Sequence, residues 1–126
     1  VMLDIDNFKC VNDTYGHQEG DAVIIGLSDI LRDEKAVCQQ KSVSGRWGGE
    51  EFMMLLYDTE VSAAYTAAER IRQRFADTDF PKSGHQTISL GVTQARTDDT
   101  LDTLCTRVDE ALYKAKQTGK NKAVVI

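Results

Sequence analysis

The chain has 126 residues, of which 41% are hydrophobic and 28% charged, and its 20 acidic and 15 basic side chains give a net charge of −5. This length suits one globular domain with a single core, and the acidic balance argues against a general nucleic-acid-binding protein, which needs clustered Lys and Arg. No apolar run approaches the roughly 20 residues of a membrane helix and no signal peptide precedes the first predicted strand, so we expect a cytoplasmic domain. Membrane anchoring of a longer parent protein stays open. Three cysteines at unrelated spacings predict neither a disulfide framework nor a zinc site.

The first predicted element is a short strand that ends in acidic residues. Residues 1–3 are apolar, and in a strand the alternation of side chains would place Asp4 and Asp6 on one face. A helical stretch begins at residues 7–9, and Asp6 is a suitable N-cap for it. Asp4 is then a candidate ligand for Mg²⁺, which prefers oxygen donors. We therefore predict a metal role for Asp4 and a capping role for Asp6.

A second helix and a β-hairpin are predicted next. Apolar residues at helical spacing mark a helix from about residue 20 to residue 32. Gly48 and Gly49 then connect an extended stretch, residues 42–47, to a continuous apolar stretch, residues 52–57, which is typical of a tight hairpin. Glu50 and Glu51 would stand at the start of the second strand. Taken alone, these two glutamates fit an ordinary solvated hairpin equally well.

The remaining elements complete an α+β fold. Ala64, Ala68, Ile71 and Phe75 share one face of a third helix, and Pro81 closes the segment that follows it. Residues 87–92 alternate as a half-buried strand, residues 101–115 carry an apolar helical stripe, and residues 123–126 form a short last strand. We predict one domain over residues 1–126, with helices packed on a mainly antiparallel sheet.

Five motifs stand in the order and spacing of GGDEF domains, and the similarity covers nearly the whole chain. The chain thus resembles the catalytic domain of diguanylate cyclases, enzymes of bacterial signalling. The resemblance implies the βααββαβ core of nucleotidyl cyclases and polymerase palms, which is ferredoxin-like. In chain order the motifs are Asp4-Ile5-Asp6-Asn7-Phe8-Lys9, Val11-Asn12-Asp13-Thr14-Tyr15-Gly16-His17 with Gly20-Asp21, Arg46-Trp47-Gly48-Gly49-Glu50-Glu51-Phe52, Ala111-Leu112-Tyr113-Lys114-Ala115-Lys116, and Gly119-Lys120-Asn121.

The resemblance implies a site for Mg²⁺ or Mn²⁺. Asp4, the Ile5 carbonyl and Glu50 would be the metal ligands, and the family often assigns proton acceptance to the position of Glu50 as well. A metal-bound carboxylate is a poor base, so we favour the ligand role. Glu51 is a candidate for a further metal or base contact.

The resemblance also implies where GTP would bind. Guanine would be recognised by Asn12 and Asp21, whose side chains offer the required acceptors and donor, with His17 nearby. An alternative for Asn12 is a helix or turn cap, and an alternative for His17 is an exposed or structural histidine at the Gly16 turn. The phosphates would be held by the backbone amides of Phe8 and Lys9 and by the side chains of Lys116 and Lys120. The lysines near the C-terminus would equally suit a helix end, with Gly119 as the C′ residue.

The implied reaction joins two GTP molecules into cyclic di-GMP, and each domain holds only one of them. A second copy of the domain is therefore an expected partner. The alternatives are a catalytically silent GTP-binding module and, less favoured, a single-nucleotide cyclase. Retention of Asp4, Glu50 and Glu51 favours the enzyme over the silent module.

Three positions depart from the family pattern. Gln39 and Ser42 stand where many members carry an Arg-x-x-Asp product-inhibition site, so we predict no feedback inhibition there. Lys120 stands where arginine is usual, and lysine lacks the planar fork of a guanidinium. The chain also opens inside the first strand, without the family's leading helix and Asp-x-Leu-Thr motif. We expect a sensor or dimerisation domain before it in a longer protein.

Overall fold

A five-stranded sheet forms the centre of the computed structural model, which describes residues 1–37 and 41–126, with only the backbone of residues 36 and 37. The strand order is β2-β3-β1-β6-β7, and all neighbours are antiparallel except β6 and β7. The prediction of a mainly antiparallel sheet is confirmed. The strands are β1 (Met2–Ile5), β2 (Ser42–Gly48), β3 (Glu51–Leu56), β6 (Ile88–Val92) and β7 (Ala123–Val125).

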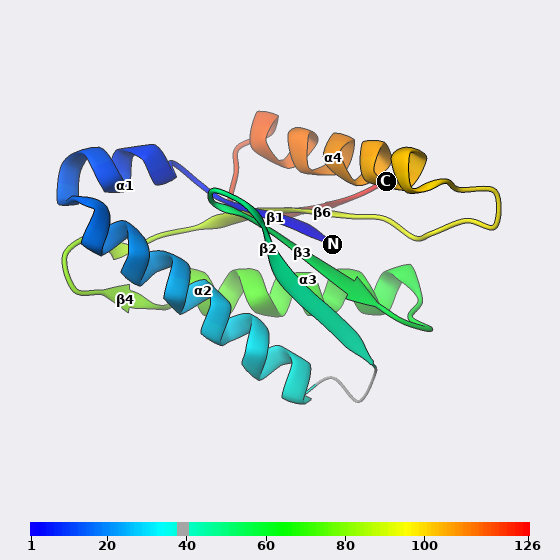
Figure 1. Cartoon of the computed structure of the whole chain (residues 1–126), viewed down its shortest axis with the longest axis horizontal. Coiled ribbons are helices and arrows are strands. Elements are labelled where there is room, and N and C mark those ends of the chain that lie inside the picture. Colours follow the sequence, from blue (N-terminus) through cyan, green and yellow to red (C-terminus); the bar gives the residue numbers. More distant parts are fainter. Residues whose placement is uncertain (38–40) are drawn as a thin grey trace.

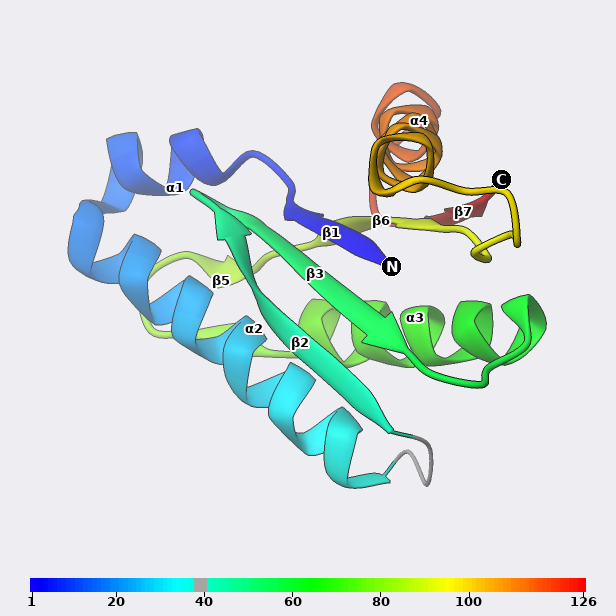
Figure 2. The ribbon, with the colours of Figure 1, turned by 45° about the vertical axis from the view of Figure 1, so that its right-hand side comes forward.

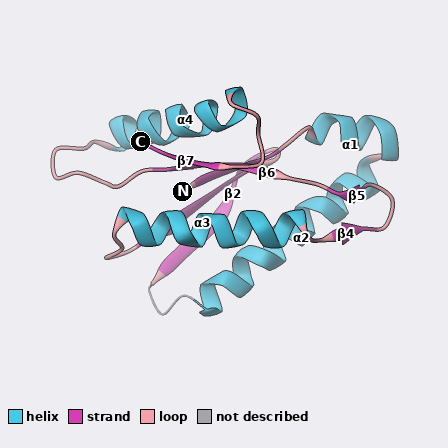
Figure 3. Cartoon of the chain, turned by 180° about the vertical axis from the view of Figure 1, so that it is seen from behind, coloured by secondary structure: helices cyan, strands magenta, loops and turns pink. Residues whose placement is uncertain are grey.

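Helices cover both faces of the sheet (Figure 1). They are α1 (Phe8–Tyr15), α2 (His17–Val37), α3 (Val61–Ala76) and α4 (Leu101–Gln117). Seen from behind, α2 and α3 lie on one side of the sheet and α4 lies on the other (Figure 3). Apart from a short two-stranded insertion between α3 and β6, the element order reproduces the predicted βααββαβ core, and the predicted last helix and last strand follow it as α4 and β7.

Strand alternation decides which side chains meet which helices. Leu3, Ile5, Phe52 and Met54 are buried in the larger core, together with apolar residues of α1, α2 and α3. Met2 points the other way and is buried with Val108 and Leu112 of α4. Because side chains alternate along a strand, Asp4 lies on the same face as Met2, which is the face that α4 covers.

Gly91 in β6 allows α4 to approach this face closely. A Cβ at residue 91 would lie 2.5 Å from the Val108 carbonyl oxygen and 2.5 Å from the Leu112 nitrogen. Both are backbone atoms of α4, so they cannot turn aside as a side chain would. The end of α4 thereby comes close to the end of β1.

Two features of the fold differ from the sequence-based expectation. Helix α2 begins at His17 and continues to Val37, beyond the predicted residues 20–32. A two-stranded sheet of β4 (Asp79–Phe80) and β5 (Gly84–His85) was not predicted, because two-residue strands are too short to show alternation. The buried Glu19 carboxylate holds the loop between them by accepting from the Ser83 and Lys82 backbone N–H groups and from the Ser83 hydroxyl.

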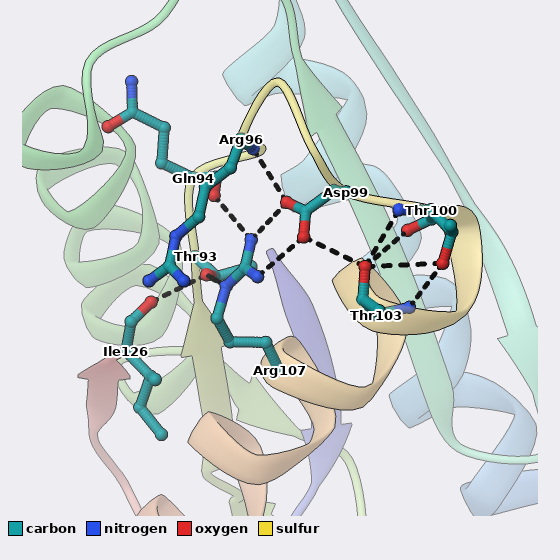
Figure 4. A network of polar contacts seen from close by, with 8 residues as sticks. All are labelled: Thr93, Gln94, Arg96, Asp99, Thr100, Thr103, Arg107 and Ile126. Carbon is teal, nitrogen blue, oxygen red and sulfur yellow. Dashed lines mark hydrogen bonds and ion pairs between the residues drawn. The ribbon is translucent and has the colours of Figure 1, made fainter.

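A network of polar contacts holds the connection between β6 and α4 (Figure 4). The Arg107 guanidinium donates to both carboxylate oxygens of Asp99, at 2.9 and 2.6 Å, and to the Thr93 hydroxyl at 2.7 Å. Asp99 also accepts from the Arg96 backbone N–H at 2.7 Å. A capping box between Thr100 and Thr103 then starts α4.

No helix in the described part of the chain is long and apolar enough to cross a membrane.

Candidate functional site

The hairpin turn and the end of β1 meet at one end of the sheet (Figure 2). The Ile5 backbone N–H donates to the Glu50 carbonyl oxygen at 3.3 Å, and Asp4 stands directly opposite Glu51 in the β1–β3 ladder. Directly opposite residues of an antiparallel pair share a face of the sheet. The structure therefore brings together the three acidic residues that the sequence singled out at positions 4, 50 and 51.

The hairpin turn itself is formed by Gly49 and Glu50, while Gly48 still belongs to β2. Gly49 has φ 38°, in the left-handed region that glycine enters without steric cost. The pairing slips between Arg46 and Gly48, as in a β-bulge, and the Arg46 Nε donates to the Gly49 carbonyl oxygen at 2.8 Å. The predicted two-glycine connection is thus displaced by one residue, because the bulge absorbs Trp47.

Lys116 of α4 joins this acidic group. Its Nζ donates to Asp4 Oδ1 and to Asp6 Oδ1, both at 2.9 Å. Burial lowers the pKa of Lys116, but the hydrogen bonds and charges of the two carboxylates outweigh it and leave the pKa above its usual value. Lys116 is therefore a firmly held cation beside the predicted metal ligand Asp4.

The carboxylates raise each other's affinity for protons. The pKa of Asp4 is raised by burial and, to a lesser extent, by the charges of Glu50 and Asp6, against the opposing effect of Lys116. The pKa of Glu51 is raised by burial and by Asp4, Asp109 and Glu50. Negative charge is therefore in excess here, and a bound cation would relieve it.

The donor set fits a hard cation such as Mg²⁺ in part. Among the described residues, no three His, Cys, Asp or Glu side chains are grouped closely enough to form a metal cage. Mg²⁺ does not require such a cage, since it commonly binds one or two carboxylates plus substrate phosphates. The residues that could hold it are Asp4 and Glu50, with the Ile5 carbonyl as an extra oxygen.

The prediction that Asp6 caps α1 is wrong. The N-cap residue is Asn7, with φ 56° and no side-chain capping bond, and Asp6 is instead buried at 2% exposure. Its carboxylate accepts from the Thr87 and Ser89 hydroxyls, the Asn121 backbone N–H and Lys116. Burial raises the pKa of Asp6, but these donors outweigh it and hold the pKa below its usual value. The alternation that placed Asp6 beside Asp4 was the signal for this role.

The start of α1 is open to an anion. The Asn7 side chain does not cap the helix, because its Oδ1 accepts from Lys120 Nζ at 2.9 Å. The backbone N–H groups of Phe8 and Lys9 meet no acceptor in the part of the chain that the structure describes. Helix N-termini of this kind bind phosphate groups. The predicted phosphate contacts of Phe8, Lys9 and Lys120 thus lie beside one another.

The predicted guanine residues lie where α1 and α2 meet. Asn12 is inside α1, at neither of its caps, and its side chain lies against Gly20, where an added Cβ would come within 1.9 Å of Asn12 Oδ1. Asp21 follows Gly20 and is exposed, and His17 is the exposed first residue of α2, directly after the Gly16 turn. The Asn12 side chain makes no hydrogen bond within the described residues, so both ends of its amide are available.

Comparison with known proteins decides the family. Residues 1–122 match the family model described as diguanylate cyclase, GGDEF domain. The chain belongs to the GGDEF family. A diguanylate cyclase of Vibrio cholerae is 39% identical over 99% of this GGDEF chain and 39% of its own length. Diguanylate cyclase DgcM of Escherichia coli K12 is 38% identical over 98% of this chain and 30% of its own length. The chain thus spans only 39% and 30% of the lengths of these two relatives.

Solved GGDEF structures have the same fold. The active GGEEF domain of a diguanylate cyclase from Vibrio cholerae gives a TM-score of 0.88 at 39% identity, over 98% of this chain and 79% of that one. Diguanylate cyclase SiaD of Pseudomonas aeruginosa, solved with its activator SiaC, gives 0.89 at 37% identity, over 99% of this chain and 48% of that one. The predicted α+β, palm-like fold class is confirmed.

A cavity lies at the opposite end of β1 from Asp4, and Trp47 of the GGDEF motif is among its lining residues. It has a volume of about 540 Å³ and is lined mainly by apolar side chains, among them Leu55, Leu101 and Leu104, at the end of β1 where Val1 stands. The Val1 nitrogen donates to the Met54 carbonyl oxygen at 2.8 Å. Asp4 and Lys116 are at the other end of β1.

Proposed function

We propose that this GGDEF domain is the catalytic part of a diguanylate cyclase, which condenses two GTP molecules into cyclic di-GMP and two pyrophosphates. The observation that carries the proposal is the convergence of Asp4, Glu50 and Lys116 at one end of the sheet, beside the open N-terminus of α1. In this reaction each 3′-hydroxyl attacks the α-phosphate of the other GTP, with pyrophosphate as the leaving group.

In the proposed mechanism the domain binds and orients one GTP. The Phe8 and Lys9 N–H groups, Lys116 and Lys120 hold the terminal phosphates, which places the α-phosphate towards Asp4 and Glu50. A Mg²⁺ or Mn²⁺ ion bound by Asp4, Glu50 and the Ile5 carbonyl would supply electrostatic stabilisation of the oxygens that gain negative charge. Glu51, whose pKa is raised by burial and neighbouring carboxylates, is a candidate to take up a proton.

Guanine selection is assigned to Asn12 and Asp21. Asn12 can both donate and accept through its amide, and Asp21 can accept from two N–H donors of guanine. Adenine would leave these polar groups unpaired, and a site built on hydrogen bonds discriminates strongly against such an analogue. His17 lies close to this region in sequence and completes the proposed set.

Activity would require a second copy of the domain, because each site holds one GTP. We propose a homodimer in which two such sites face each other, and a longer parent protein whose sensor or dimerisation domain precedes Val1. The apolar cavity beside Val1 offers a surface that such a domain could cover.

Product inhibition through an Arg-x-x-Asp site is not expected. Ser42 is buried at the start of β2 and offers no carboxylate, and Gln39 lies outside the described residues. Arg46 remains nearby but is engaged with the Gly49 carbonyl oxygen. The proposed enzyme would therefore not respond to its product through this site.

The test is product formation by a version of the chain fused to a dimerising coiled coil, incubated with GTP and Mg²⁺. We expect cyclic di-GMP, and we expect Glu50→Gln to lose it by a factor on the order of 10² or more, since it removes a charged ligand of the cation. Glu110→Gln on the exposed face of α4 is the matched control. GTP binding without product would support a catalytically silent module instead. Addition of cyclic di-GMP should leave the rate unchanged, and inhibition mapping near residue 42 would contradict the absence of feedback.

A further inference from the structure

The Asp6 carboxylate is a buried junction between four parts of the chain. Its Oδ1 accepts from the Ser89 hydroxyl at 2.7 Å and from Lys116 Nζ at 2.9 Å. Its Oδ2 accepts from the Thr87 hydroxyl at 2.8 Å and from the Asn121 backbone N–H at 3.1 Å. One side chain at the end of β1 thereby joins β6, α4 and the turn that follows α4.

Only a carboxylate can satisfy this set of donors. The Lys116 ammonium and the Asn121 N–H can donate but cannot accept, and they approach different oxygens of Asp6. An asparagine in place of Asp6 has a single oxygen, so whichever way its amide turned, its NH₂ group would face one of these two donors. The two hydroxyl donors are more tolerant, because a hydroxyl can also accept.

The turn held by Asp6 has an unusual backbone. Lys120 and Asn121 have φ values of 60° and 46°, and two consecutive non-glycine residues in the left-handed region cost free energy. The turn is retained by the Lys120 N–H bond to the Ala115 carbonyl oxygen, by the Asp6 contact and by Arg72, which donates to Asn121 Oδ1. The direction in which the Lys120 side chain points therefore depends on these bonds.

We infer that Asp6 is a positioning residue that sets both proposed triphosphate-binding lysines, Lys116 through its ammonium and Lys120 through the backbone of the neighbouring Asn121. This rests on the proposed function, which assigns those lysines to GTP. Lys116 has two anchors, and Asp4 is the one that a bound cation would occupy. Asp6 then keeps the ammonium at the phosphate end while Asp4 binds the cation.

The experiment compares nucleotide binding, not turnover, between the wild-type chain and Asp6→Asn. Affinities for GTP and for GMP are measured by calorimetry in the presence of Mg²⁺. We expect the preference for GTP over GMP to fall by a factor on the order of ten, the size of effect typical when a charged hydrogen-bond partner is lost. Affinity for GMP should change by less than about twofold, since GMP lacks the terminal phosphates that Lys116 and Lys120 would bind. Glu34→Gln is the matched control, because Glu34 is also a buried, ion-paired carboxylate but lies between α2 and α3.

A double-mutant cycle with Lys116→Met separates positioning from general damage. If Asp6 acts through Lys116, the effect of Asp6→Asn on the GTP preference should shrink to less than about threefold in the Lys116→Met background. The effect of Asp6→Asn that persists in the Lys116→Met background would be the part that acts through the turn at Lys120. Equal effects in both backgrounds would overturn the inference for Lys116.

Folding is checked by circular dichroism before binding is measured. If Asp6→Asn alone does not fold, the GTP and GMP affinities of Asp6→Asn and its parent are compared in an Asn121→Gly background. Glycine at residue 121 adopts a positive φ without the cost that Asp6 helps to offset. If folded Asp6→Asn prefers GTP over GMP as strongly as the wild-type chain does, the inference is overturned and the proposed function is unaffected. A wild-type chain that binds GTP no better than GMP would overturn the lysine assignment itself, and the inference with it.

Discussion

At the scale of single residues, the proposed guanine site depends on a glycine that carries no chemistry. Gly20 is buried in the first turn of α2, and the Asn12 amide lies directly against it. A side chain at residue 20 would occupy the place of Asn12 Oδ1, and it would come within 3.3 Å of the Phe8 ring. The glycine therefore lets α1 and α2 meet closely enough for Asn12 to lie beside Asp21.

We predict that Gly20→Ala lowers the affinity for GTP but changes the free energy of unfolding little. The new methyl group would displace the Asn12 amide, which is the end of a flexible side chain, and affinity for GTP should fall on the order of tenfold, as for one lost hydrogen bond pair. Unfolding free energy should change by less than about 1 kcal/mol, because alanine favours the helix by about that amount. Calorimetry and urea unfolding measure the two. Gly45→Ala, where an added Cβ meets no atom of the described residues within 4 Å, is the control. Unchanged GTP affinity in Gly20→Ala would contradict the placement of Asn12.

At the scale of elements, the position of α4 over β6 determines where Lys116 lies. Helix α4 carries Lys116 in its last turn, and its other end starts at the capping box of Thr100 and Thr103. Between them, Gly91 lets the backbone of α4 approach the sheet. At the C-terminal end of α4 the Lys120 N–H donates to the Ala115 carbonyl oxygen, and Gly119, which precedes Lys120, has φ 117°. This is a Schellman-type ending and agrees with the predicted C′ glycine.

We predict that Gly91→Ala destabilises the fold by roughly 1–3 kcal/mol or more, as expected for overpacking against atoms that cannot rotate away. The added methyl group would meet backbone atoms of Val108 and Leu112 at 2.5 Å, so α4 itself has to shift. Urea unfolding measures the loss, with Gly45→Ala again as the control. An unchanged unfolding midpoint would mean that α4 does not lie as close to β6 as the structure shows.

At the scale of the whole molecule, ion pairs link elements that are distant in the sequence. Arg70 Nε of α3 donates to the buried Glu34 of α2 at 2.8 Å, and Arg107 of α4 holds Asp99 in the loop after β6. The Asp99 and Arg107 side chains are only 9% and 12% exposed. Such pairs act through the stability of the whole fold, because unfolding releases both partners to water.

We predict that Asp99→Asn lowers the melting temperature at pH 7 and that the difference from wild type narrows in acid. Hydrogen bonds from Arg107, then from Arg96, hold the pKa of Asp99 well below its usual range. A carboxyl with a lowered folded-state pKa stabilises above its unfolded value of about 3.9, and this stability is lost as the pH falls below that value. Thermal unfolding between pH 7 and pH 2 measures the effect. Asp13→Asn, exposed on α1, is the control; a difference that stayed constant down to pH 2 would contradict the role of the charged pair.

Sequence patterns predicted the long helices well and predicted the ends of elements, such as helix caps and the hairpin turn, less well. Helices α3 and α4 show apolar periodicity over many residues, and the structure places them and the short strand β6 close to the predicted positions. The prediction that β6 is half-buried is wrong, because all five of its residues are buried between the helices on the two faces of the sheet. Asp6 was assigned to a helix cap, because capping depends only on adjacent residues and its real partners are 81 to 115 residues away. The hairpin turn was predicted one residue too early, since a bulge leaves no mark in the pattern of polar and apolar residues.

By itself the sequence determined the fold class, the order of the main elements and the set of residues that mark the GGDEF family. These depend on local propensity, alternation and spacing, which are all readable along the chain. Only the tertiary structure decided that Lys116 bridges Asp4 and Asp6, that Asn12 lies over Gly20 and that the Asp6 carboxylate joins Lys116 to the backbone of Asn121. Lys116 and Asp4 are 112 residues apart. Such contacts follow from the strand order and from how closely a helix approaches the sheet, and no local pattern specifies either.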